Sequence, residues 1–256
     1  MSLQPFELTG VDGKRIKGNR TDGTDRQILF ITGFLSKRWG NKSKALAQWC
    51  QEKGWGFCCY DVRGFGDSEG QFTDYTLSDW IADAQTVLES IKSGPPITIV
   101  GNSLGSWIAW LVAQEFPIVE EVILIAPAFN MMGERAKTIS EERLHDWHTA
   151  GWMPWDDDPL HRDWSLSWKW VEESERYWVK TFEVVRHVKT TILHGEQDIV
   201  ISPDGSRRFT NELLCRDPSF PLDLQLVPGD HRLSAPEHLD LFQRLVERRA
   251  NAHIDP

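Results

Sequence analysis

The stretch "ITIVGNSLGSWIAWLVAQ" (97–114) joins two kinds of predicted structure at a serine. Residues 97–100 form a short apolar run with β-branched side chains, which is typical of a buried strand. Residues 103–114 carry apolar side chains at the spacing of a buried helix. Between them lies Gly101-Asn102-Ser103-Leu104-Gly105. The sequence therefore predicts a serine on a sharp turn from a strand into a helix.

Strand and helix patterns alternate on both sides of this turn. Apolar strands are predicted at 27–33, 57–64, 121–129, 190–200 and 222–229, and helices at 43–54, 77–91 and 236–249. The early segment 6–20 is predicted to be an antiparallel hairpin. Apolar strands that alternate with helices indicate an α/β fold, with a mostly parallel sheet covered on both faces. Ligands bind at the carboxyl edge of such a sheet.

Residues 130–189 interrupt this alternation. They contain helical stretches at 140–148 and 165–182 and no strand pattern. Seven of the chain's 13 tryptophans lie within the segment. We therefore expect a core made of residues 1–129 and 190–256, and a helical, Trp-rich lid made of residues 130–189.

A serine is a weak nucleophile unless a base removes its proton and an acid orients the base. His231 lies between the last predicted strand and the last helix, at the same sheet edge as Ser103. His194 lies inside a predicted strand, so we expect it to be packed or hydrogen-bonded. Asp198 fits the acid better than Glu196 because it lies in the loop past the strand end. We expect Ser103, Asp198 and His231 to form a catalytic triad.

The tetrahedral intermediate of acyl transfer needs two hydrogen-bond donors for its oxyanion. One donor is expected to be the backbone N–H of Leu104, which follows the nucleophile. The other is expected to be the N–H of Phe34, in a turn that Gly33 permits. Because only its backbone is used there, the Phe34 side chain can shape the substrate pocket. We expect the pocket wall to contain Phe34, Trp152, Trp155 and Trp168.

Two further segments are predicted to be structural. "DVRGFGDSEG" (61–70) matches neither phosphate-binding glycine motif, so we expect a tight loop that Arg63 braces through Asp61 or a nearby carbonyl. "WDDDPLHRDW" (155–164) contains Asp156, Asp157, Asp158, His161 and Asp163. No second ligand set follows at a fixed spacing, so we expect no metal and no cofactor.

The composition narrows the classes of partner. A net charge of −10 and a pI of about 5.3 argue against nucleic acid and anionic membranes as partners. No apolar run approaches a membrane span, and "MSLQPFELTGVDGKRIKG" contains no signal-like apolar segment. The four cysteines form no C-x-x-C pair. We expect a cytoplasmic protein with reduced thiols and a small-molecule or acylated substrate; the sequence carries no signal for an oligomeric state.

Five motifs in this order resemble those of serine α/β-hydrolases along the whole chain. They are "ITGF" (31–34), "DVRGFGDSEG" (61–70), "GNSLG" (101–105), "HGEQDIVIS" (194–202) and "GDHRLS" (229–234). More narrowly, "GFLSKRWGNKSKALAQWCQEKGW" (33–55) and "GDHRL" resemble the acyl-protein thioesterase and acyl-glucuronide esterase branch of abhydrolase-domain proteins. Thr32-Gly33 replaces the usual His-Gly of the oxyanion motif. The resemblance implies an α/β-hydrolase fold of about eight strands, the same triad and oxyanion donors, and an ester or thioester substrate.

Three functions are compatible with these residues. The leading hypothesis is a hydrolase that cleaves a carboxylic ester or a thioester through an acyl-enzyme. A serine-dependent hydrolase of C–C bonds in vinylogous 1,5-diketones is an alternative within enzymes. A non-catalytic receptor for a small ligand is an alternative outside them. Dehalogenases and epoxide hydrolases of this fold need an aspartate nucleophile, which Ser103 replaces here.

Overall fold

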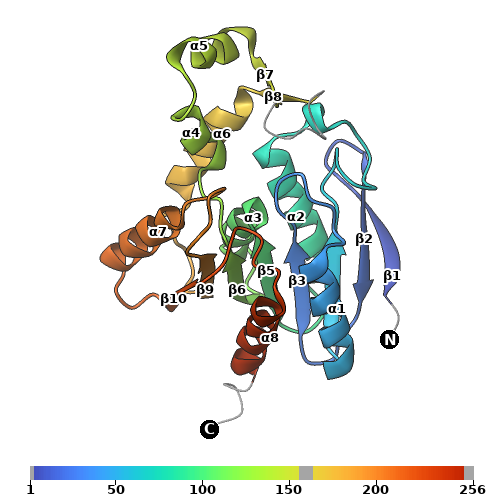
Figure 1. Ribbon diagram of the computed structural model, residues 1–256. Coiled ribbons are helices and arrows are strands. Elements are labelled where there is room, and N and C mark those ends of the chain that lie inside the picture. Colours follow the sequence, from blue (N-terminus) through green and yellow to red (C-terminus); the bar gives the residue numbers. More distant parts are fainter. Residues whose placement is uncertain (1–2, 156–163, 251–256) are drawn as a thin grey trace.

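A computed structural model of the chain describes residues 3–155 and 164–250. Its main sheet has eight strands in the order β1-β2-β4-β3-β5-β6-β9-β10 (Figure 1). The pairs β1–β2 and β2–β4 are antiparallel, and every pair from β4 to β10 is parallel. The predicted hairpin and the mostly parallel sheet of about eight strands are therefore confirmed.

The strands are β1 (Gln4–Thr9), β2 (Arg15–Thr21), β3 (Gln27–Ile31), β4 (Gly56–Tyr60), β5 (Ile97–Asn102), β6 (Val119–Ile125), β7 (Trp152–Pro154), β8 (Ser165–Ser167), β9 (Lys189–Gly195) and β10 (Leu222–Val227). The helices are α1 (Asn41–Lys53), α2 (Leu77–Ile91), α3 (Leu104–Ala113), α4 (Met131–Ala136), α5 (Glu141–Ala150), α6 (Lys169–Lys180), α7 (Pro203–Arg216) and α8 (Pro236–Ala250). A short 3₁₀ helix, η1, spans Phe72–Asp74.

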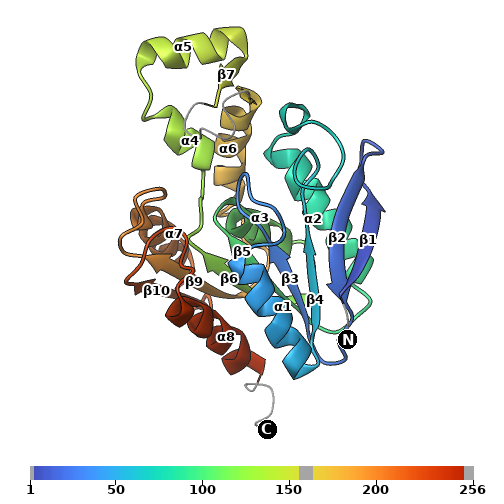
Figure 2. The same ribbon diagram turned by 45° about the vertical axis from the view of Figure 1, so that its right-hand side comes forward.

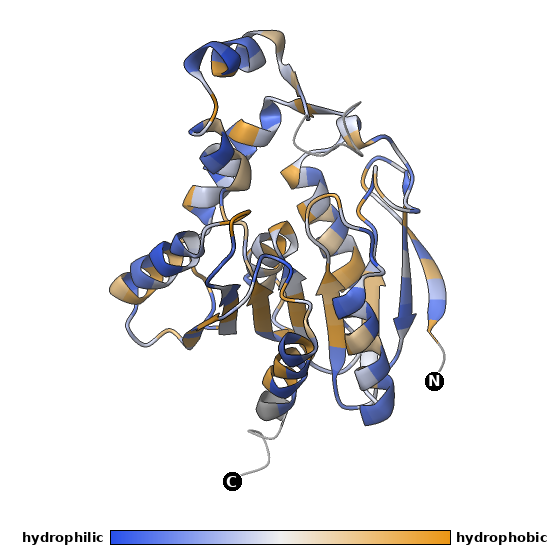
Figure 3. Cartoon of the chain, in the orientation of Figure 1, coloured by the Kyte–Doolittle hydropathy of each residue, from blue (hydrophilic) through white to orange (hydrophobic). Residues whose placement is uncertain are grey.

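Helices cover both faces of the sheet, as predicted. Apolar side chains of α1 and α8 pack on one face, and those of α2, α3 and α7 pack on the other. Side chains of β3 alternate between these two cores: Ile28 and Phe30 face α1 and α8, whereas Leu29 and Ile31 face the opposite helices. Figure 3 shows the apolar strands enclosed between helices whose outer surfaces are hydrophilic. Strands β3, β4, β5, β6 and β9 are thus buried from both sides.

The strands end earlier than the sequence pattern predicts. Strand β9 ends at Gly195, whereas the prediction ran to residue 200. The Asp198 carboxylate accepts hydrogen bonds from the N–H groups of Val200 (2.9 Å) and Ile201 (2.8 Å), which closes a turn there. The residues that follow β9 therefore belong to a loop, which can contribute side chains to a functional site.

Helix α7 was not predicted. Its start has the expected signals, because Ser202 accepts a hydrogen bond from the N–H of Asp204 and Pro203 occupies the first turn. Its buried positions, however, include Ser206 and Thr210 beside Phe209. These polar residues weaken the apolar period that marks a helix in sequence.

The described parts of the segment 130–189 contain α4, α5 and α6, and these helices lie over the carboxyl edge of the sheet (Figures 1 and 2). The prediction that it holds no strand is wrong. Strands β7 and β8 pair antiparallel, so residues 165–167 are extended and α6 begins only at Lys169. Strands of three residues are too short to show an alternating pattern. The division into a core and a lid stays a prediction.

Arg63 braces the loop 61–70, but not through Asp61. Its guanidinium pairs with Asp83 and Asp12 and donates to the carbonyl of Asp79 at 3.1 Å. Arg38 pairs with Asp61 instead. The expected contact with a carbonyl is confirmed and the contact with Asp61 is wrong, because the Arg63 side chain lies against α2.

Cys50, Cys58 and Cys59 are buried thiols, Cys215 is exposed, and all four are free, as predicted. Within residues 3–155 and 164–250, no helix combines the length and the apolar character needed to cross a bilayer.

Candidate active site

Ser103 lies at the turn between β5 and α3, as the sequence predicts. Its backbone has φ 54° and ψ −121°, a conformation that residues with a side chain rarely adopt. Neighbouring backbone holds it there: the Ser103 N–H donates to the carbonyl of Ile125 at 2.8 Å, and its carbonyl accepts from Ala128 at 3.1 Å. This strained geometry is that of a nucleophile elbow.

The glycines around Ser103 are required by close backbone approach. A Cβ at Gly105 would lie 2.2 Å from the carbonyl oxygen of Thr32, and one at Gly101 would lie 2.5 Å from Cα of Ser106. Both contacts involve backbone atoms that cannot rotate away. Only glycine lets helix α3 begin this close to the end of β3.

Gly105→Ala should therefore lower the free energy of unfolding by about 3 kcal/mol, since the new methyl group overlaps the backbone. Urea unfolding measures the change. Gly205→Ala in α7 is the matched control, because a Cβ there meets nothing within 4 Å. It should leave stability unchanged or raise it by about 0.5 kcal/mol. Equal stability of the two variants would contradict the packing argument.

The structure brings Ser103, His231 and Asp198 together. His231 Nε2 lies 3.2 Å from Ser103 Oγ, and its Nδ1 lies 2.7 Å from Asp198 Oδ2. An ionised carboxylate only accepts hydrogen bonds, so Nδ1 carries the proton and Nε2 can accept from the serine hydroxyl. Ser103 and Asp198 are buried, whereas the imidazole is partly exposed.

Asp198 is held as a carboxylate by several donors. Burial raises the pKa of Asp198, but hydrogen bonds from His194 and His231 and from the N–H of Ile201 outweigh burial. The net result is a pKa below the usual range of an aspartate. The charge that orients the imidazole therefore persists under acidic conditions.

The low pKa of Asp198 also predicts how stability depends on pH. An acid whose pKa falls on folding stabilises the protein above its unfolded pKa, and this contribution is lost as the pH falls. The difference in unfolding free energy between the wild type and Asp198→Asn should be constant above about pH 5 and shrink below about pH 4. Urea unfolding across this range checks the prediction. A difference that already changes near neutral pH would oppose it.

His194 contacts the acid from behind, a role that sequence reasoning missed. It is fully buried in β9, and its Nε2 lies 3.1 Å from Asp198 Oδ2 and 3.0 Å from the carbonyl of Ile201. Both partners are acceptors, so Nε2 carries a proton; Nδ1 accepts from Ser206 Oγ at 2.8 Å. The expectation of a hydrogen-bonded histidine is confirmed. The signal for its contact was the four-residue spacing in "HGEQD".

The loop after β3 passes directly beside the nucleophile. A Cβ at Gly33 would lie 3.0 Å from Ser103 Cβ. Leu104 opens helix α3, so its N–H has no acceptor within the helix. Within the described part of the chain, the N–H groups of Phe34 and Leu104 have no hydrogen-bond partner. The role of both amides as oxyanion donors stays a prediction.

The Phe34 ring lies in an aromatic cluster with side chains from the core and from the segment above it. Its centroid is 5.3 Å from that of Trp155 and 5.6 Å from that of Trp170. Trp80 and Phe72 complete the contacts at 5.8 Å and 5.7 Å. These rings form an apolar wall beside the loop that approaches Ser103.

Of the three predicted pocket tryptophans, Trp155 contacts Phe34. Trp168 packs edge-on against Trp147 at 5.4 Å, and Trp152 is 46% exposed. Trp170, not Trp168, contacts Phe34. Side chains two residues apart along a helix point about 200° apart, so the two rings face opposite ways. Trp152, Trp155 and Trp168 as substrate contacts stay predictions.

Residues 156–163, which include Asp156, Asp157, Asp158, His161 and Asp163, lie outside the described residues. Within the described ranges, no cluster of His, Cys, Asp or Glu side chains could hold a metal ion.

Residues 24–155 match the family described as Serine aminopeptidase, S33. Palmitoyl-protein thioesterase ABHD10, mitochondrial, from Mus musculus is 27% identical over 244 residues, which cover 94% of this chain and 78% of that protein.

Two solved structures resemble the whole chain. A putative hydrolase from Agrobacterium vitis S4 has a TM-score of 0.87 at 22% identity, covering 97% of this chain and 99% of that one. Alpha/beta hydrolase domain-containing protein 10 from mouse has a TM-score of 0.84 at 22% identity, covering 98% and 99% respectively. These similarities confirm the predicted α/β-hydrolase fold.

Proposed function

This chain belongs to the serine aminopeptidase S33 family of serine α/β-hydrolases, and on that premise we propose that it cleaves a carboxylic ester or thioester through an acyl-enzyme. The observation that carries the proposal is the hydrogen-bond chain from Ser103 through His231 to Asp198. This arrangement activates a hydroxyl for attack on an acyl carbon.

The reaction uses the groups described above. His231 Nε2 takes the Ser103 proton as Oγ attacks the acyl carbonyl, and the N–H groups of Phe34 and Leu104 stabilise the oxyanion. The imidazolium then gives its proton to the leaving alcohol or thiol, which leaves an acyl-enzyme. A water molecule, deprotonated by His231, attacks the acyl carbon and releases the carboxylic acid and Ser103. Asp198 remains ionised throughout.

The chemistry of the wall supports an apolar acyl group. The Phe34, Trp155 and Trp170 rings offer an aromatic surface beside the loop of the expected oxyanion donors. The relative from Mus musculus is named a palmitoyl-protein thioesterase, which supports thioesters among the substrates. The family description names an aminopeptidase, so an amide substrate belongs in the same assay.

A fluorophosphonate probe tests the nucleophile first. The proposal expects labelling at Ser103, identified by mass spectrometry of the peptide, and competition by a hydrolysable ester. A series of 4-nitrophenyl esters and thioesters from acetyl to palmitoyl then ranks the acyl groups, with a 4-nitroanilide as the amide. An unlabelled protein that still binds acyl compounds would favour the receptor. Labelling with turnover of a ring-fission product alone would favour the C–C hydrolase.

The compartment is part of this proposal. Free thiols at Cys50, Cys58, Cys59 and Cys215 support a reducing location such as the cytoplasm. The ABHD10 relative is named mitochondrial. Cell fractionation with an antibody to this chain distinguishes the two locations.

A further inference from the structure

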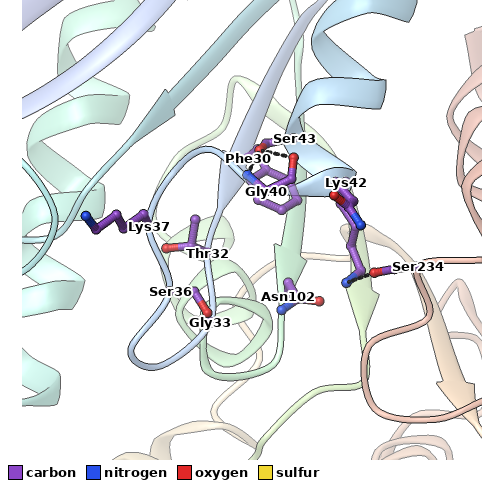
Figure 4. Close-up of a pocket in the computed structure, with 11 residues that line it drawn as sticks. Phe30, Thr32, Gly33, Ser36, Lys37, Gly40, Lys42, Ser43, Asn102 and Ser234 are labelled. Carbon is purple, nitrogen blue, oxygen red and sulfur yellow. Dashed lines mark hydrogen bonds between the residues drawn. The ribbon is translucent and has the colours of Figure 1, made fainter. Parts of the chain in front are cut away.

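A cavity of about 150 Å³ lies behind the loop that approaches Ser103. Figure 4 shows it between the loop after β3, the first turn of α1 and the loop that carries Ser234. Thr32, Gly33, Ser36, Lys42, Asn102 and Ser234 are among the residues that line it. Phe34 is not, so this cavity is separate from the aromatic wall.

Lys42 places a buried positive charge in the cavity. The residue is only 9% exposed, and its Nζ lies 3.4 Å from a neutral partner, Ser234 Oγ. Within the described residues, the direct partner of Lys42 Nζ is this hydroxyl, and Asp230 acts on Lys42 through its charge without a hydrogen bond. Burial lowers the pKa of Lys42 to about 8, Asp230 raises it and Arg232 lowers it. At neutral pH the fold therefore holds a buried ammonium group that has no direct ion-pair partner among the described residues, with Asp230 acting on it from farther away.

The rest of the cavity wall also suits a negative group. Helix α1 begins here, so the positive end of its dipole adds to the charge of Lys42. Asn102 is the last residue of β5, and its Oδ1 is buried without a hydrogen-bond partner. A rotated amide would turn its NH₂ donors to a bound oxyanion. No carboxylate is among the residues that line the cavity.

Three residues of the cavity wall are neighbours of the catalytic residues, in sequence or in space. Asn102 directly precedes Ser103. Gly33 lines the cavity and also lies beside Ser103, because a Cβ built on Gly33 would be 3.0 Å from Ser103 Cβ. Ser234 follows His231 on the loop that supplies the base, and His231 is the group that protonates the leaving group. An anion in this cavity would thus lie next to residues that flank the nucleophile and the base.

We propose that this cavity is a subsite for a carboxylate or phosphate that the substrate carries near its scissile bond, on the leaving-group side. The claim that the anion is part of a substrate rests on the proposed function. The binding of an oxyanion at Lys42 is independent of it. Lys42 supplies the charge, and Asn102 and the start of α1 supply dipoles.

Thermal unfolding tests the site without any assay of activity. Inorganic phosphate or acetate, compared with chloride at equal ionic strength, should raise the wild-type Tm by roughly 3–6 °C at ten times the dissociation constant. Lys42→Met should remove this shift and, without the oxyanion, should raise Tm by several degrees because an unpaired buried charge is lost. Exposed Lys44→Met is the control and should behave as the wild type. Absence of a shift with both anions in the wild type would overturn the site.

A pair of esters tests the link to the substrate. The wild type should hydrolyse 3-carboxy-4-nitrophenyl butyrate with a lower KM than 4-nitrophenyl butyrate, and Lys42→Met should reverse this preference by roughly tenfold. Lys42→Gln repeats the test should the methionine variant not fold. An anion-dependent Tm with no change in this preference would contradict the substrate role. A Tm shift in a protein that hydrolyses neither ester would instead count against the proposed function.

Discussion

Ser103→Ala should lower kcat for 4-nitrophenyl butyrate by about 10⁴- to 10⁶-fold, the largest effect expected of any single substitution in this chain. The hydroxyl is the atom that His231 Nε2 faces at 3.2 Å, and alanine offers nothing that can form an acyl-enzyme. With Phe34 and Leu104 as the proposed oxyanion donors, residual turnover would come from polarisation of the carbonyl by their N–H groups for direct attack by water. The fluorophosphonate probe should no longer label the protein.

Ser106→Ala is the matched control for that measurement. Ser106 is also buried at the start of α3, but its hydroxyl donates to the carbonyl of Ile125 at 3.0 Å. Its loss should reduce stability by about 1 kcal/mol and leave kcat unchanged. The protein would not be a Ser103 hydrolase if Ser103→Ala retained wild-type turnover while remaining folded.

Asp198→Asn should lower kcat by about 10³- to 10⁴-fold. Asp198 Oδ1 accepts from two backbone N–H groups, so the carbonyl oxygen of an asparagine would occupy that place. The NH₂ group would then face His231 Nδ1 and force the proton onto Nε2. An imidazole with a proton on Nε2 cannot accept the one from Ser103.

Glu196→Gln is the control, because Glu196 is the other acid in the same loop and is exposed. It should leave kcat within about twofold, as expected for a solvated side chain without a contact to the imidazole. If Glu196→Gln lost as much activity as Asp198→Asn, the assignment of Asp198 as the acid would be wrong. Steady-state kinetics on the three proteins decides between these outcomes.

The sequence predicted the sheet and the meeting of the three triad residues for one physical reason. Parallel strands deliver their carboxyl ends to one edge, so the residues that follow β5, β9 and β10 lie near one another regardless of their separation in sequence. The glycines at 101 and 105 were informative because backbone contact leaves no room for a side chain.

Other parts of the site depend on packing that has no sequence period. Trp168 and Trp170 are the same residue type two positions apart, so the sequence does not distinguish them. The start of α6 at Lys169 decides which ring contacts Phe34. His194 contacts Asp198 because β9 ends one residue after His194, and the apolar Ile199 and Val200 beyond the polar residues 196–198 make that boundary hard to place from the sequence. Lys42 is buried by Ser234 from a loop almost two hundred residues away. Such long-range contacts are invisible to local pattern reasoning.

The support of Asp198 by donors other than His231 has a consequence for motion within the site. If the imidazole rotated outward into solvent, the carboxylate would keep hydrogen bonds from His194, Val200 and Ile201. The anion would then need neither a new proton nor a new partner. Rotation of His231 would therefore cost the two hydrogen bonds of the imidazole itself and leave the acid in place beside β9.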